Sequence, residues 1–304
     1  MAGDSWLGEA LVVRFGALPG LMVAGLLWAA PASGTSNVIN DASGAAPITD
    51  VTPPGHVAEV STAADYLDEI GLLEEPWLAY PGLSADSDGD ARRDIAVSVS
   101  RLHSGEYVLA VRGTDFENLW TGPLSFEQAV VNYFSHTTEL VNVATAALSA
   151  ARVPVDAAVT VVGHSLGGMV GVNLAQLDAS EPDRVPGVIT DVLASAAPVQ
   201  HMSTGNASVL VIENDSDGIP RLDDLVAWRR PPMLFVAFRN DRSQPPQAQH
   251  QHEVYQRRMR ALTAEHDLGQ FRGDPAGAAA WLQAWDVRYV SPGVEWTRWY
   301  RADF

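Results

Sequence analysis

Short runs of β-branched and other apolar residues alternate along the chain with longer stretches in which apolar residues recur at helical spacing. The apolar runs predict strands at residues 95–102, 107–111, 159–162, 188–196, 209–212 and 234–238. The helical spacing predicts helices at residues 62–73, 126–151, 166–177, 253–264 and 276–285. Because strands that alternate with helices form sheets covered on both faces, we expect an α/β fold: a mostly parallel sheet flanked by helices.

An apolar segment, residues 1–33, precedes the predicted domain. Between Ala10 and Ala32 its only charged residue is Arg14, and Ala30-Pro31-Ala32 resembles a signal-peptide cleavage site. Its start carries acidic residues in place of a basic cluster, however, and glycine and proline interrupt any spanning helix. Three interpretations stay open: a packed helix or hairpin, a cleaved signal peptide, and an anchor that contacts a membrane. Localisation therefore also stays open between secretion, the cell envelope and the cytoplasm.

The remaining chain divides into a linker and one domain. Residues 34–56 are rich in Ser, Gly, Ala, Asp and Pro, which predicts a linker, and the domain is expected to occupy residues 57–304. Near its end, Trp296, Trp299 and Tyr300 are predicted to pack in the core or on an edge strand.

Composition narrows the chemistry. The chain has 304 residues, 47% of them hydrophobic, which is enough for one large α/β domain. It has no cysteine, so disulfides, thiolate nucleophiles and cysteine-bound zinc are excluded. The formal net charge is −18, and a field of that sign repels phosphate backbones, which argues against nucleic acid as a partner.

The most informative motif is Gly163-His164-Ser165-Leu166-Gly167, which lies between a predicted strand and a predicted helix. In this Gly-x-Ser-x-Gly context the serine occupies a strained turn, and the flanking glycines prevent clashes with the neighbouring strand and helix. Its hydroxyl is then presented at a helix N-terminus, where backbone N–H groups favour a developing oxyanion. The alternative is a glycine-rich turn that only packs closely or holds a phosphate. We give His164 no catalytic role.

Three runs together resemble the α/β-hydrolase superfamily, and most closely its class 3 lipase-like esterases and lipases. They are Val111-Arg112-Gly113-Thr114, the turn at Ser165, and Asp217-Gly218-Ile219-Pro220-Arg221-Leu222, in the order of that family. The resemblance implies an α/β-hydrolase fold and a catalytic serine, with no metal or organic cofactor.

The resemblance also implies roles for the other site residues. Thr114 and the N–H of Leu166, the residue after the nucleophile, would form the oxyanion hole, although Thr114 would equally suit an ordinary strand-end turn. The family pattern places the acid three residues before a proline, which selects Asp217, with Asp215 as the alternative or as a loop cap.

The catalytic base is the least determined member of the set. The superfamily order Ser, Asp, His leaves His250, His252 and His266. His266 is followed five residues later by Phe271, a spacing that resembles the family's, and His250 has the same spacing to Tyr255. We expect His266 to be the base, with His250 as the alternative.

The sequence thus predicts a serine hydrolase that cleaves small-molecule or lipid carboxylic esters. A loop or lid at residues 116–126 is expected over the acyl pocket. A peptidase, a thioesterase or an acyltransferase would use the same acyl step. A catalytically silent scaffold used for binding is the alternative of another class, and it predicts that no histidine lies within about 3 Å of the Ser165 hydroxyl.

Overall fold

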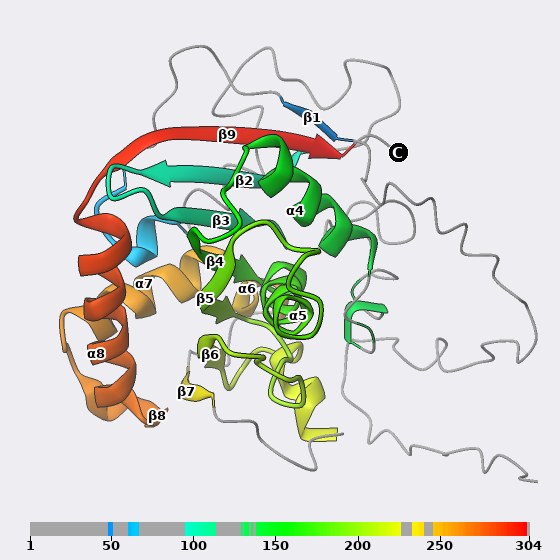
Figure 1. Ribbon diagram of the computed structural model, residues 1–304. Helices are drawn as coiled ribbons and strands as arrows, with labels where there is room; N and C mark the ends of the chain where they lie inside the picture. Colours follow the sequence, from blue (N-terminus) through cyan, green and yellow to red (C-terminus); the bar gives the residue numbers. More distant parts are fainter. Residues whose placement is uncertain are drawn as a thin grey trace, which may run out of the picture. The chain divides into compact units, whose positions relative to one another are not determined.

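A mixed sheet forms the centre of the part of the chain that the structure describes (Figure 1). The structure is a computed structural model that describes residues 48–50, 60–66, 95–113, 129, 131–133, 135, 138–225, 233–239 and 246–302, all within the compact unit Ser43–Phe304. The sheet joins nine strands of these residues in the order β1-β9-β2-β3-β4-β5-β6-β7-β8. The strands are β1 (Ile48–Asp50), β2 (Ile95–Leu102), β3 (Tyr107–Val111), β4 (Ala158–His164), β5 (Val188–Ser195), β6 (Ser208–Asn214), β7 (Leu234–Phe238), β8 (Phe271–Gly273) and β9 (Val294–Ala302).

The central strands β3 to β7 run parallel, and both edges of the sheet are antiparallel. The predicted α/β fold with a parallel sheet between helices is therefore confirmed for the centre of the sheet. Because the carboxyl ends of β3 to β7 lie at one edge, the loops that follow these strands converge there.

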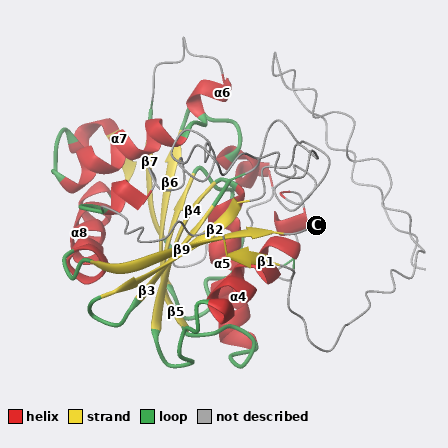
Figure 2. Ribbon diagram, turned by 90° about the horizontal axis from the view of Figure 1, so that it is seen from above, coloured by secondary structure: helices red, strands yellow, loops and turns green. Residues whose placement is uncertain are grey.

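Helices cover both faces of the sheet (Figure 2). The helix α4 (Glu139–Ala150) contacts β2 and β3 and α5 (Leu166–Ser180) contacts β4 and β5, whereas α7 (His252–Thr263) contacts β6 and α8 (Pro275–Trp285) contacts β7. The short helices are α6 (Pro246–Gln249), the 3₁₀ turns Pro220–Leu225 and Leu268–Gln270, and one π-helical turn, Asp286–Val290. Among the described residues, none of the helices combines the length and the apolar character needed to span a membrane.

Side-chain alternation along the central strands explains why both faces need cover. In β6, Val209 and Val211 pack in the hydrophobic cluster with α4 and α5, whereas Leu210 and Ile212 pack in the cluster with α7 and α8. Successive side chains of a strand point to opposite faces, so a strand buried on both sides becomes an uninterrupted apolar run. This is the pattern from which the sequence predicted these strands.

Two predicted boundaries are wrong. Ile48–Asp50 lies in the predicted linker 34–56 but forms the edge strand β1, paired with β9. The predicted helix 126–151 is interrupted, because Thr138 adopts an extended backbone and its hydroxyl caps the start of α4 by accepting from the N–H of Val141. The aromatic residues near the C-terminus lie in β9, where Trp299 and Tyr300 are buried, in accord with their predicted packing role. Residues 1–33 lie outside the described residues.

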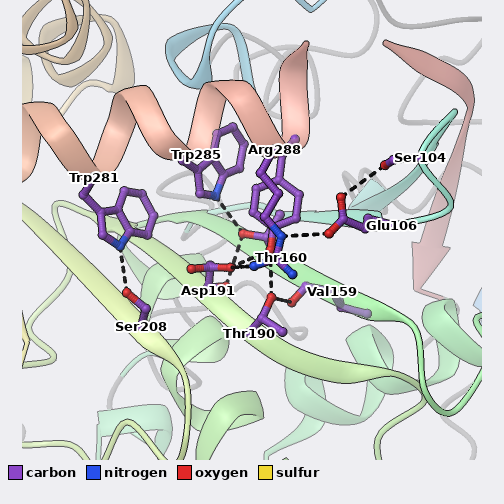
Figure 3. A network of polar contacts seen from close by, with 11 residues as sticks. Ser104, Glu106, Val159, Thr160, Thr190, Asp191, Ser208, Trp281, Trp285 and Arg288 are labelled. Atoms are coloured by element: carbon purple, nitrogen blue, oxygen red, sulfur yellow. Dashed lines mark hydrogen bonds and ion pairs between the residues drawn. The ribbon is translucent and has the colours of Figure 1, made fainter. Parts of the chain in front are cut away.

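A network of polar contacts ties α8 and the π-helical turn to the starts of the central strands (Figure 3). The indole N–H groups of Trp281 and Trp285 donate to Ser208 and Thr160, at 2.8 and 2.9 Å. Tyr289 donates to the carboxylate of Asp191 at 2.5 Å, and Arg288 bridges the carboxylates of Asp191 and Glu106. These contacts lie away from the carboxyl ends of the strands, so they stabilise the sheet and its cover and leave the opposite edge to the candidate site.

Asp286, the first residue of the π-helical turn in this network, makes the stability of the folded protein depend on pH. Burial, together with the charge of Asp65, raises its pKa from 3.8 to about 6, although the N–H of Ala63 donates to its carboxylate at 2.6 Å. Because the folded-state pKa is raised, the stabilising contribution of the protonated group is complete below pH 3.8 and is lost as the pH rises through about 6.

We therefore expect Asp286→Asn to flatten the dependence of the unfolding free energy on pH between about pH 5 and 7.5, by roughly 0.5–1 kcal/mol, because solvent screens the charge of this half-buried carboxylate. Denaturant unfolding at both pH values measures this difference. Asp183→Asn, at an exposed carboxylate, is the matched control and should keep the wild-type slope. An unchanged slope in Asp286→Asn would contradict the prediction.

Candidate active site

Ser165 occupies the sharp turn between β4 and α5. It has a φ of 54° and a ψ of −121°, a conformation with positive φ that is strained for a side chain with a Cβ. Its N–H donates to the carbonyl oxygen of Ser195 at 2.8 Å, which continues the β4–β5 pairing past the end of β4. The tertiary packing thus holds the serine in the strained strand-to-helix turn that the Gly-x-Ser-x-Gly motif predicts.

The glycines of the motif are required by close backbone contacts. A Cβ on Gly163 would overlap the carbonyl group of Gly167 and lie 2.5 Å from the nitrogen of Gly168. A Cβ on Gly167 would overlap the carbonyl oxygen of Val111 at the end of β3. Helix α5 can therefore lie directly against the strand ends only because these positions lack side chains.

A chain of hydrogen bonds joins Ser165 to His250 and Asp217. The Nε2 atom of His250 lies 2.8 Å from Ser165 Oγ, and its Nδ1 atom lies 2.6 Å from Asp217 Oδ2. All three side chains are buried. Because the carboxylate can only accept, Nδ1 carries the proton, and Nε2 is left to accept from the serine hydroxyl.

Asp217 lies in the loop after β6 and is held by two donors besides His250. The Ile219 N–H donates to its Oδ1 at 3.0 Å, and the hydroxyl of Tyr255 donates to its Oδ2 at 2.7 Å. Burial by itself would raise the pKa of Asp217, but the charge and hydrogen bond of His250, with these two donors, hold it below 3.8. Asp217 therefore stays an acceptor at neutral pH and fixes the imidazole tautomer.

The expectation that His266 is the base does not agree with this geometry. His266 is exposed in the turn after α7, where its backbone N–H donates to the carbonyl oxygen of Ala261. His250, the alternative, precedes α7 and takes the position between Ser165 and Asp217. The two histidines are separated by the length of α7, and only the one at its N-terminal side reaches the strand ends.

The alternative acid, Asp215, has other partners. Its carboxylate forms an ion pair with Arg272 of β8, and its N–H donates to the carbonyl oxygen of Phe238. Asp215 therefore links the loop after β6 to the edge of the sheet, while Asp217 faces the histidine.

The predicted oxyanion hole is described in part. Leu166 is fully buried. It follows Ser165 as the first residue of α5, so its backbone N–H lies at the N-terminus of that helix. Thr114 and the predicted lid, residues 116–126, lie outside the described residues.

A second histidine and aspartate pair lies on the segments that follow β5 and β6 and has different partners. His201 Nδ1 lies 2.6 Å from Asp223 Oδ1, and its Nε2 lies 2.9 Å from the carbonyl oxygen of Tyr133. Burial would lower the pKa of His201, but its hydrogen bonds to Asp223 and Tyr133, with the charge of Asp223, raise it above 6.5. Both ring nitrogens are occupied by acceptors, so this pair anchors the residues before α4.

Sequence reasoning missed the supporting side chains. Tyr255 stood at the noted spacing of five residues from His250, and that spacing was the one local signal for its contact with the acid. The contacts of His164 with Ser195 and with the carbonyl of His250 span 31 and 86 residues and had no local signal.

The arrangement places a hydroxyl, an imidazole and a carboxylate in the order in which a histidine can remove the proton of a serine. Within the described residues, no group of three or more His, Asp and Glu side chains is arranged to hold a metal ion.

In comparisons with known proteins, no family model and no curated protein matched this chain.

Proposed function

We propose that this chain is a serine hydrolase of the α/β-hydrolase fold that cleaves carboxylic esters through an acyl-enzyme on Ser165. The observation that carries the proposal is the hydrogen-bonded chain from Ser165 Oγ through His250 to Asp217, with distances of 2.8 and 2.6 Å. A silent scaffold would not need a histidine at that distance from the serine, and 2.8 Å between Ser165 Oγ and His250 Nε2 is within the range for proton transfer.

Each residue has a defined part in the proposed reaction. His250 takes the proton of Ser165 as Oγ attacks the ester carbonyl, and Asp217 stabilises the imidazolium that forms. The proton then passes to the leaving alkoxide, and the acyl group stays on Oγ. A water molecule, deprotonated by His250, attacks the acyl-enzyme, releases the carboxylic acid and restores the serine.

The oxyanion of both tetrahedral intermediates would be stabilised by the N–H of Leu166. The position of Leu166 at the start of α5 supports this role, because backbone N–H groups at a helix N-terminus face developing negative charge. By its resemblance to the lipase-like family, Thr114 would supply the second donor. The same acyl step would serve a thioesterase, a peptidase or an acyltransferase. The choice of a carboxylic ester as the substrate therefore rests on the resemblance to the lipase-like family.

The test is covalent labelling with a fluorophosphonate probe. Oγ of an activated serine attacks phosphorus and displaces fluoride, so peptide mapping should find one adduct per chain, on Ser165, and none in Ser165→Ala. Hydrolysis of p-nitrophenyl esters of increasing acyl length, with matched amides and thioesters, then measures which bond is cleaved. Folded protein that neither labels nor hydrolyses any of these compounds would refute the proposal.

A further inference from the structure

The turn that carries His250 lies between α6 and α7 and is held through its main chain. Two successive carbonyl groups of this turn, those of Gln249 and His250, accept hydrogen bonds from buried side chains at the ends of two central strands. The donors are His164, the last residue of β4, and Asn214, the last residue of β6. The carbonyls at the end of a helix as short as α6 need such partners when they are buried.

His164 connects the base to the strand end that presents the nucleophile. Its Nε2 lies 2.7 Å from the carbonyl oxygen of His250, and its Nδ1 lies 3.2 Å from the hydroxyl of Ser195. A carbonyl only accepts, so Nε2 carries the proton, whereas the Ser195 hydroxyl has one proton to share between Nδ1 and the carbonyl oxygen of Gly163, which lies 3.3 Å from it. Because His164 and Ser165 are adjacent, one strand end sets both the position of the nucleophile and that of the base.

Asn214 connects the base to the loop that carries the acid. Its Nδ2 donates to the carbonyl oxygen of Gln249 at 3.0 Å and to the side-chain oxygen of Gln249 at 3.1 Å. Its Oδ1 accepts from the N–H of Ser216, the residue before Asp217. One fully buried amide therefore holds both the acid loop and the turn of the base.

We infer that His164 and Asn214 are positioning residues that hold His250 through its main chain between Ser165 and Asp217. This inference rests on the proposed function. The imidazole must lie within hydrogen-bond reach of two partners at once, and displacements of about 1 Å in such sites cost on the order of 10²-fold in rate. The side chain of His250 hydrogen-bonds to Asp217 and Ser165, and the two main-chain contacts fix the turn from which it extends.

The test compares variants that remove these donors with one that restores a donor. His164→Leu removes the N–H that binds the His250 carbonyl, and Asn214→Leu removes both the N–H groups that bind Gln249 and the Oδ1 acceptor of Ser216. His164→Gln offers an amide N–H in place of Nε2. The readouts are kcat and KM for an ester, the pH profile of fluorophosphonate labelling at Ser165, and the far-downfield proton resonance of His250 Nδ1–H. His266→Leu, at an exposed position outside the site, is the matched control.

We expect both leucine variants to lower kcat and the labelling rate by about 10- to 100-fold, with KM within about 3-fold of the wild type. The His250 resonance should shift or broaden, and His164→Gln should recover most of the rate. If a leucine variant fails to fold, Ser195→Ala, which removes only the hydroxyl beside His164 Nδ1, should lower the rate by a smaller factor in protein that still folds.

Two failures are distinguishable in this experiment. Wild-type rates together with an unchanged resonance in the folded leucine variants would overturn the positioning role while leaving the hydrolase proposal intact. Wild-type protein without labelling or turnover would overturn the proposed function, and the resonance would still report whether the two side chains hold His250 beside Asp217.

Discussion

His250→Asn is expected to lower kcat/KM for esters, and the rate of labelling at Ser165, by about 10⁴-fold. The asparagine amide can still donate to Asp217 Oδ2, which accepts from His250 at 2.6 Å, so the buried carboxylate keeps a partner. What is lost is Nε2, the atom 2.8 Å from Ser165 Oγ that would receive its proton. Steady-state kinetics and time-resolved probe labelling measure the two losses independently.

His266→Asn is the matched control, because His266 has the same predicted family spacing but is exposed after α7. It should have wild-type kinetics and wild-type labelling. A loss of activity in His266→Asn with full activity in His250→Asn would reverse the assignment of the base and contradict the structure.

Gly167→Ala is expected to destabilise the protein by roughly 3 kcal/mol or more and to abolish labelling of Ser165. The added Cβ would overlap the carbonyl oxygen of Val111 and lie 2.8 Å from that of Arg112. These are backbone atoms at the end of β3, so they can give way only if α5 moves off the strand ends. Such a movement would displace both Ser165 and the N–H of Leu166.

Denaturant unfolding measures the stability of this variant, with Gly269→Ala as the control. A Cβ on Gly269 has 4.0 Å to its nearest neighbour, the carboxylate of Asp267, so this substitution should leave the unfolding midpoint near that of the wild type. A wild-type midpoint in Gly167→Ala would show that α5 does not pack against β3 as closely as described.

The sequence by itself determined the elements whose physical cause is local. Strands buried on both faces become continuous apolar runs, so β3 and β7 were predicted with the bounds that they have. β2 was predicted with its own bounds from β-branched residues that alternate with serines. The turn at Ser165 was also predictable, because a strained backbone between a strand and a helix demands glycines at fixed positions, and Gly163 and Gly167 occupy them.

Only the tertiary structure decided which distant side chains meet Ser165. His250 and His266 carry the same local signal, an aromatic residue five positions later, and the placement of α7 brings the first of them to the strand ends and leaves the second exposed. The edge strand β1 pairs with β9, which is about 250 residues away in the sequence, and no local pattern records this pairing. The roles of Tyr255, His164 and Asn214 likewise arise from hydrogen bonds that span 35 to 86 residues of sequence. A buried polar group bonds to whichever partner the fold brings next to it, so its partner need not be near in sequence.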